Sequence, residues 1–230
     1  MPLNRTIPAI QALIFDFDGT LVDASEPICR SFNLALERFG LPQLDDEAIK
    51  RLIGQPLRDM FPAVAPHLSP ADIERLIDYY REAFMPIACA LSRPMPGLRA
   101  MLTHFSPHLK MAIATSRISD GAFRILDAMH IRSAFPVVIG LQDVNNAKPH
   151  PEPVLKALAA LDVSPEHAVM VGDVPADMLA GKAAGAWAIG FPSKHYPAAD
   201  LKAAGADAMI TSLADLIDLI PLDVNVPSTP

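Results

Sequence analysis

The stretch ALIFDFDGT, residues 12–20, is an apolar run that leads directly into two aspartates and a glycine. Its first four residues are all apolar, which is typical of a strand buried on both faces of a parallel sheet. Asp16 and Asp18 therefore fall at the carboxyl end of that strand, where open α/β sheets bind their ligands. This stretch predicts both the fold class and the position of a functional site.

Similar apolar runs recur along the chain and alternate with segments of helical spacing. Further strands are expected at residues 111–114, 136–141, 168–171, 186–190 and 208–210, and helices at 121–129, 152–161 and 176–184. Strands that alternate with helices pair in parallel and are covered by the helices. We therefore expect an α/β fold with a doubly wound, Rossmann-like parallel sheet.

The segment between the first two expected strands breaks this alternation. It contains no convincing strand, and its helical patterns lie at residues 27–39, 46–53, 57–64 and 70–83. A plain crossover between parallel strands needs far fewer residues than this segment holds. The excess length predicts an inserted helical cap.

The expected cap divides the core into two pieces of sequence. The predicted parts are a core at 1–22 and 95–220, a cap at 23–94, hinges near 21–23 and 92–97, and a flexible tail at 221–230. The tail is predicted from its polar, proline-rich composition.

The composition of the chain excludes several classes of protein. Of its 230 residues, 51% are hydrophobic and 20% are charged, which supports a sizeable core and argues against global disorder. No apolar run reaches the roughly 18–20 residues of a membrane helix, and the start of the chain lacks the apolar stretch of a secretory signal. A net charge of −7 gives no global attraction to nucleic acid. We therefore expect neither a membrane nor a nucleic-acid partner.

The two cysteines indicate the cellular compartment. Cys29 and Cys89 lie far apart and do not form a CxxC pair, which argues against a disulfide staple or a zinc site. We expect two reduced, buried thiols, which are typical of a cytoplasmic protein.

Polar residues follow several of the expected strands and would meet at one edge of the sheet. They are Asp16 and Asp18, Thr115 and Ser116, Lys148 in the loop after the third strand, and Asp173 and Asp177. Two carboxylates about 4 Å apart repel each other by roughly 4 kcal/mol at an effective dielectric constant of 20. Such a cluster favours a divalent cation, and hard oxygen ligands suit Mg²⁺.

These polar segments resemble, in the same order, the four signature motifs of the haloacid dehalogenase superfamily. The segments are DFDGTLVD (16–23), ATS (114–116), KPHPE (148–152) and GDVPAD (172–177), within a resemblance that spans residues 12–217. Residues 31–36, 39–42, 96–98 and 184–190 also resemble the phosphoglycolate-phosphatase-like branch. The resemblance implies that superfamily's α/β core with a helical cap of the C1 type.

The resemblance also implies a role for each residue. Asp16 would be the nucleophile that forms an aspartyl phosphate, and Asp18 would protonate the leaving group and then activate water. The residues implied in phosphate binding are Gly19, Thr115, Ser116 and Lys148, and those in Mg²⁺ binding are Asp16, Asp18 through its main-chain carbonyl, Asp173 and Asp177, the last through water or indirectly. The implied function is a Mg²⁺-dependent phosphatase for a small phosphomonoester, phosphoglycolate-like or a sugar phosphate.

Asp18 narrows the choice among members of this family. Family dehalogenases and phosphonatases lack an acid at this position, and phosphonatases also use a lysine of the cap. Lys50 is the only lysine between Asp18 and Lys110, and its pattern predicts a helix surface. Two alternatives stay open: a phosphomutase similar to β-phosphoglucomutase, and a non-catalytic phospholigand-binding protein, although a pure binder has no need of Asp18.

A cap over the strand ends would exclude water and recognise the leaving group. Our candidates for this recognition are Arg51, Gly54 and Arg58, in the segment RLIGQPLRD. Arginine binds a carboxylate through two parallel hydrogen bonds, so phosphoglycolate would suit such a site. The expected partner is a small phosphorylated metabolite, and the chain is expected to be a monomer or a homodimer.

Overall fold

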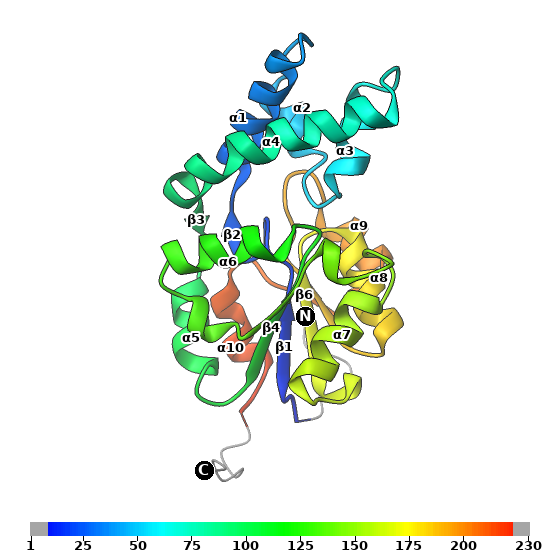
Figure 1. Ribbon diagram of the computed structural model, residues 1–230. Helices are drawn as coiled ribbons and strands as arrows, with labels where there is room; N and C mark the ends of the chain where they lie inside the picture. Colours follow the sequence, from blue (N-terminus) through cyan, green and yellow to red (C-terminus); the bar gives the residue numbers. More distant parts are fainter. Residues whose placement is uncertain (1–8, 223–230) are drawn as a thin grey trace.

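The computed structural model describes residues 9–222 and consists of a parallel sheet flanked by helices, with further helices above it (Figure 1). Six strands form the sheet in the order β5-β4-β1-β6-β7-β8. Their bounds are β1 Ala12–Phe15, β4 Lys110–Ala114, β5 Val137–Ile139, β6 Ala168–Gly172, β7 Trp187–Gly190 and β8 Ala208–Met209. Counted along the chain, these are strands 3-2-1-4-5-6 of a doubly wound sheet. The predicted fold class is confirmed.

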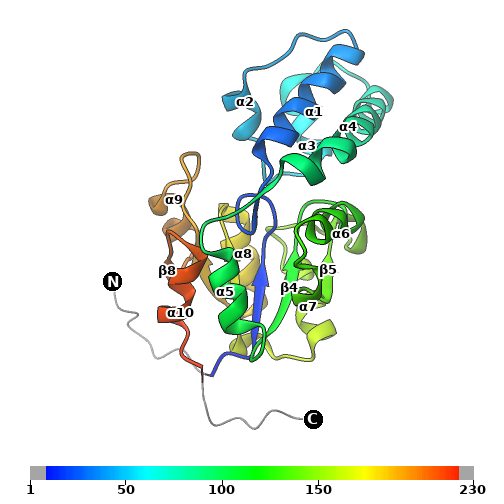
Figure 2. The same cartoon turned by 90° about the vertical axis from the view of Figure 1, so that its left-hand side faces the viewer.

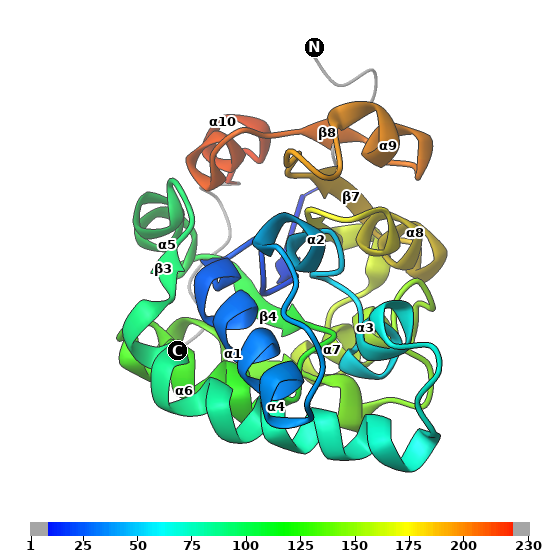
Figure 3. The ribbon, with the colours of Figure 1, turned by 90° about the horizontal axis from the view of Figure 1, so that it is seen from above.

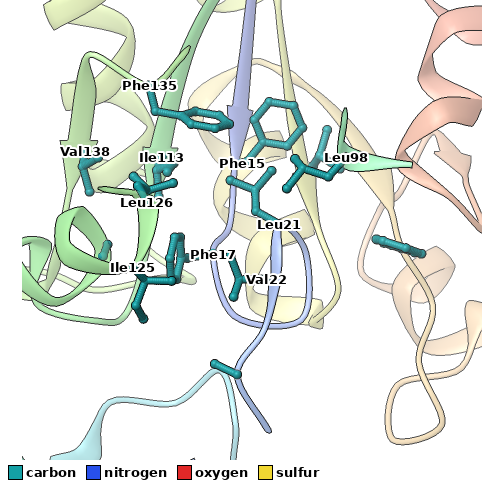
Figure 4. Packing of buried hydrophobic residues seen from close by; sticks show 14 of the residues in the cluster. Phe15, Phe17, Leu21, Val22, Leu98, Ile113, Ile125, Leu126, Phe135 and Val138 are labelled. Carbon is teal, nitrogen blue, oxygen red and sulfur yellow. The ribbon is translucent and has the colours of Figure 1, made fainter. Parts of the chain in front are cut away.

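The two faces of the sheet pack against different helices because successive strand residues point to opposite sides. Ala12 and Ile14 of β1 belong to a cluster with α7 (Glu152–Leu161) and α8 (Pro175–Ala184). Leu13 and Phe15 of β1 belong instead to a larger cluster that includes Phe135, whose ring meets Phe15 edge-on at 5.9 Å (Figure 4). The alternation leaves β1 fully buried, so its carboxyl end is held rigidly.

The remaining elements of the core complete this packing. The helices are α5 Leu98–Phe105, α6 Ser119–Ala128, α9 Ala198–Ala203 and α10 Leu216–Leu219, and the short 3-10 helices are η1 Arg132–Ala134, η2 Leu141–Asp143, η3 Pro165–His167 and η4 Leu213–Asp215. The helix α5 was not predicted, although Leu98, Met101, Leu102 and Phe105 have the i, i+3, i+4, i+7 spacing of an amphipathic helix. This helix begins after Gly97, which adopts a φ of +81°. Its apolar side chains, those of Leu98, Met101, Leu102 and Phe105, are buried in the larger cluster.

Four helices lie above the carboxyl ends of the strands and form the cap (Figures 2 and 3). They are α1 Ser25–Arg38, α2 Asp46–Lys50, α3 Leu57–Val64 and α4 Pro70–Leu91. The chain enters and leaves them through two short antiparallel strands, β2 (Val22–Asp23) and β3 (Arg93–Pro94), which pair with each other. These strands coincide with the hinges expected from the sequence.

Aromatic rings hold the cap helices together. The ring of Phe32 in α1 stacks on that of Phe61 in α3, with 4.3 Å between the ring centroids, and its centroid lies 6.5 Å from that of the Tyr80 ring in α4. The helix α4 runs past its predicted end at residue 83, through Pro86, to Leu91. Phe84 and Ala88 in this extension are buried, and their packing offsets the backbone hydrogen bond that the proline cannot make.

Several other expectations meet the structure here. Cys29 is buried as expected, but Cys89, in the unpredicted extension of α4, is exposed, with its Sγ 3.6 Å from the carbonyl oxygen of Arg124 in α6. The prediction of two buried thiols is therefore wrong. Of the predicted tail, residues 223–230 lie outside the described residues. Between residues 9 and 222, no helix has the length and apolar character needed to cross a membrane.

The stacked ring of Phe32 predicts a large effect on stability. Replacing Phe32 by alanine should lower the free energy of unfolding by about 3–5 kcal/mol, because it leaves a cavity between α1, α3 and α4. Leu34 on the same helix is 45% exposed, so Leu34→Ala should change stability by no more than about 0.5 kcal/mol. Chemical denaturation of both variants tests this, and equal losses would contradict it.

Candidate active site

Asp16 lies at the point where the winding of the sheet reverses. It follows β1 directly, and its backbone N–H donates to the carbonyl oxygen of Val171 in β6, at 2.9 Å. The two strands belong to the two halves of the doubly wound sheet, and ligands of such sheets bind between those halves. The Asp16 side chain is buried at this position.

Lys148 joins two buried carboxylates. Its Nζ lies 2.6 Å from Oδ1 of Asp16 and 2.6 Å from Oδ1 of Asp177, and all three side chains are buried. Burial alone would lower the pKa of Lys148, but the charges of Asp16 and Asp177 outweigh it and raise the pKa above its usual value. Lys148 therefore carries its positive charge at the centre of the site.

The loop that carries Lys148 is held by Glu152 at the start of α7. The Glu152 carboxylate accepts the backbone N–H groups of Asn145, at 2.9 Å, and Asn146, at 3.0 Å. These hydrogen bonds, with that of Lys156, lower the pKa of Glu152 to about 2. Glu152 thus stays ionised at neutral pH and fixes the loop two residues before Lys148.

Three buried carboxylates form a group that fits a metal ion. One oxygen each from Asp16, Asp173 and Asp177 lie within 4.8 Å of one another. Burial raises the pKa of Asp16 to about 7, against the opposing charge of Lys148, and burial also raises the pKa of Asp173 well above its usual value. If all three were ionised, their negative charge would exceed the positive charge of Lys148, and the raised pKa values show that protons offset this excess in the metal-free protein. A divalent cation could take the place of these protons, and such hard oxygen donors suit Mg²⁺.

Gly19 and Thr20 shape the turn beside this group. Gly19 has a φ of +88°, and a Cβ at this position would lie 2.4 Å from Oδ2 of Asp173, so only glycine fits. The Gly19 amide donates to the carbonyl oxygen of Val22, and its predicted part in phosphate binding stays a prediction. The hydroxyl of Thr20 donates to Oδ1 of Asp173 at 2.7 Å. Thr20 is the last residue of the DxDGT motif, but no role was predicted for it.

The carboxylate of Asp18 lies apart from the acidic group. It receives two hydrogen bonds from the guanidinium of Arg117, at 3.0 Å from Nε and 2.8 Å from Nη2. Both side chains are largely buried, and the guanidinium lies over the ring of Phe84 from the cap, 4.4 Å from its centroid. Arg117 was not predicted, although it directly follows Thr115 and Ser116 at the end of β4. The separation gives the two aspartates of the motif different surroundings.

A cavity of about 250 Å³ lies between the cap and the core and opens on these residues. Asp16, Asp18, Thr115 and Ser116 all line it, so the structure brings together the predicted nucleophile, the predicted acid and two of the predicted phosphate-binding residues. The Thr115 hydroxyl accepts the backbone N–H of Arg117 at 3.1 Å, which orients it at the strand end.

The cap candidates divide into two that reach this cavity and one that does not. Gly54 and Arg58 line it, and a Cβ on Gly54 would lie 2.9 Å from Cγ1 of Val174 in the core. Arg51 is exposed and does not line the cavity, because α2 ends at Lys50 and Arg51 follows on its outer side. The structure therefore gives no support to Arg51 as a recognition residue.

Lys50 departs from the helix-surface position predicted for it. Its side chain is only 31% exposed and lines a second cavity of about 150 Å³, together with Asp18, Asp173 and His195. The end of α2 is turned toward the core, where Glu47 of that helix pairs with Lys194 at 2.6 Å. This contact holds the end of α2 against the core, so the side chain of Lys50 is partly buried and lines that cavity.

A comparison with known protein families identifies the family to which this chain belongs. The model of the family described as haloacid dehalogenase-like hydrolase matches residues 13–191, a stretch that holds β1, the cap and all four groups of site residues. The chain belongs to this family. The family assignment makes the protein a hydrolase and confirms the resemblance drawn from the motifs.

Named relatives of this haloacid dehalogenase-like hydrolase include phosphate-ester and pyrophosphate enzymes. The chain is 34% identical to pyrophosphatase PpaX of Anoxybacillus flavithermus, over 92% of this chain and 97% of that protein. It is 29% identical to phosphoglycolate phosphatase of Aquifex aeolicus, over 76% of this chain and 82% of that protein. Among solved structures, a putative haloacid dehalogenase-like hydrolase from Bacteroides fragilis superposes with a TM-score of 0.85 at 29% identity, covering 90% of this chain and 100% of that one.

The raised pKa of Asp16 predicts how pH affects the protein with and without Mg²⁺. A carboxyl pKa raised from 3.8 to about 7 means that the folded chain holds a proton which the unfolded chain releases. Without metal, stability should therefore fall as pH rises from about 4 to about 7. A metal ion must displace that proton, so Mg²⁺ should bind more tightly as pH rises through the same range.

Thermal melting with and without Mg²⁺ checks this prediction. Mg²⁺ should raise Tm more at about pH 7.5 than at about pH 5.5, and Asp173→Asn should abolish the rise. Asp127, exposed on α6, supplies the matched control, and Asp127→Asn should leave the rise unchanged. Equal stabilisation at both pH values would contradict the role of a protonated Asp16.

Proposed function

We propose that this protein is a Mg²⁺-dependent phosphatase that hydrolyses a small phosphomonoester through a phosphoaspartate on Asp16. The observation that carries the proposal is that Asp16 and Asp18 line one cavity but differ in their partners. Asp16 lies in the acidic group beside Lys148, whereas Asp18 lies apart from it, facing the cap. The pyrophosphatase and phosphoglycolate phosphatase names of the relatives support the same reaction class.

In the proposed reaction each residue has one task. A carboxylate oxygen of Asp16 attacks the phosphorus atom while the bond from phosphorus to the leaving oxygen breaks. Asp18 takes up a proton from solvent before this step and gives it to the leaving oxygen. Water then attacks the phosphoaspartate, Asp18 accepts the proton of the water, and inorganic phosphate leaves with Asp16 regenerated. Lys148 balances the charge of Asp16 and of the incoming phosphate throughout.

The acidic group and the cap complete the proposal. A Mg²⁺ ion held by Asp16 and Asp173, with Asp177 beside it, would neutralise the oxygens of the transferred phosphoryl group. Residues 23–94 would move as a cap about the β2–β3 pair and exclude water during transfer. Arg117 acts as a positioning residue, because its two hydrogen bonds hold Asp18 at the cavity, within reach of the leaving oxygen.

Phosphate release provides the first test of the proposal. The purified protein should release phosphate from phosphomonoesters only with Mg²⁺, and Asp16→Asn should reduce the rate by at least about 10³-fold, since it removes the nucleophile. Asp18→Asn should lower the rate by about 10²- to 10⁴-fold, which is the usual contribution of a general acid to the rate. Asp127→Asn should keep full activity.

Two outcomes would count against the phosphatase. No phosphate release from any compound in a broad panel, with Mg²⁺ still raising Tm, would contradict it. Phosphoryl exchange that depends on a sugar bisphosphate, with little free phosphate, would favour the phosphomutase instead.

The two hydrogen bonds from Arg117 to Asp18 predict that substitution of Arg117 lowers turnover without affecting Mg²⁺ binding. Arg117→Met should lower kcat by about 10- to 100-fold, because Asp18 loses the partner that sets its position. Arg117→Lys keeps the charge without the planar fork and should recover only part of the loss. The rise of Tm with Mg²⁺ should stay unchanged in both variants, and a kcat equal to that of the unaltered protein would contradict the positioning role.

A further inference from the structure

The cavity above Asp16 and Asp18 has polar side chains at its floor and at its rim, where Gln55, Arg58, Arg81 and Gln142 are exposed. Its wall away from the strand ends is formed by Ile53, Leu57, Tyr80, Phe84, Met85 and Ile118. Five of these six belong to the cap, which is the part of the chain that would contact a leaving group. The leaving-group side of the cavity is therefore apolar.

The cations at this cavity already have carboxylate partners. Among the described residues that line it, the guanidinium groups are those of Arg58, Arg81 and Arg117, and they pair with Glu74 at 2.9 Å, Asp78 at 3.5 Å and Asp18 at 2.8 Å. Arg58 and Arg81 are 69% and 45% exposed, so they lie at the rim rather than in the wall. A second anionic group held within the apolar wall, away from the arginines of the rim, would have no cation beside it, which is costly.

We infer that the substrate is a phosphomonoester of an apolar alcohol, with a branched alkyl or aryl leaving group, rather than phosphoglycolate or pyrophosphate. The inference rests on the proposed phosphatase function. An engineered apolar cavity of about 150 Å³ holds benzene, so a cavity of about 250 Å³ has room for a ring of that size next to the phosphoryl group. The substrate would be supplied by a reaction that phosphorylates an apolar primary alcohol.

A homologous series of phosphates tests the inference in the unaltered protein. Ethyl, butyl, 3-methylbutyl and benzyl phosphate are esters of primary alcohols, so their leaving groups differ mainly in apolar surface. We expect kcat/KM to rise about fourfold for each added methylene. Benzyl phosphate should exceed phosphoglycolate and pyrophosphate by at least about tenfold. Asp16→Asn, run on each compound, identifies hydrolysis by this site.

The outcomes separate this inference from the function on which it rests. A ranking led by phosphoglycolate or pyrophosphate, sensitive to Asp16→Asn, would overturn the inference and leave the phosphatase intact. Hydrolysis of none of the compounds would instead overturn the proposed function. The ranking is read in the unaltered protein and does not depend on whether any wall variant folds.

A wall variant adds a second test. Met85 is half-buried in the wall, and Met85→Lys would place an unpaired cation there. We expect it to raise kcat/KM for phosphoglycolate relative to benzyl phosphate by about tenfold. Leu34→Lys makes the same change of charge on α1, at a residue that does not line the cavity, and should leave the ratio unchanged. Equal ratios in the two variants would overturn the inference.

Discussion

The pairing of Lys148 with Asp16 and Asp177 is the interaction on which the site depends. It places one positive charge between two buried carboxylates from different strand ends. Burying a charge costs several kcal/mol unless it is paired, so these side chains are stable only together. Because Asp173 adds a third carboxylate, the fully ionised group would carry a net negative charge, which protons offset in the metal-free protein and a divalent cation would balance when bound. The excess charge therefore connects the packing of the sheet to the metal dependence that we propose.

The second constraint is steric and consists of two close contacts, one within the core and one between the cap and the core. Gly19 passes within van der Waals reach of Asp173, and Gly54 of the cap meets Val174 in the same way. Larger residues at either glycine would push these backbones apart. The contact between Gly54 and Val174 joins the cap to the core next to Asp173, and the cavity that holds Asp16 is lined by residues of both parts.

The contact of Arg117 with Phe84 connects the cap to the chemistry. The same guanidinium holds Asp18 and lies over a ring of α4, so a movement of the cap would change the surroundings of the proposed general acid. The named relatives act on pyrophosphate or phosphoglycolate, as their names state, whereas the wall of this cavity is apolar. Family membership thus agrees with a phosphatase reaction, whereas our inference about the substrate rests on the side chains of the cap.

The doubly wound sheet, the inserted helical segment and the polar residues at the strand ends could all be predicted from the sequence. The prediction was possible because apolar runs, insert length and the aspartates after β1 and β6 are local features of the chain. Three facts were seen only in the folded chain: Arg117 pairs with Asp18, Lys50 is partly buried, and Arg51 is exposed away from the cavity lining. These facts depend on how two segments distant in sequence meet, and on which face of α2 the core covers. Such contacts are set by packing between elements, which no local pattern records.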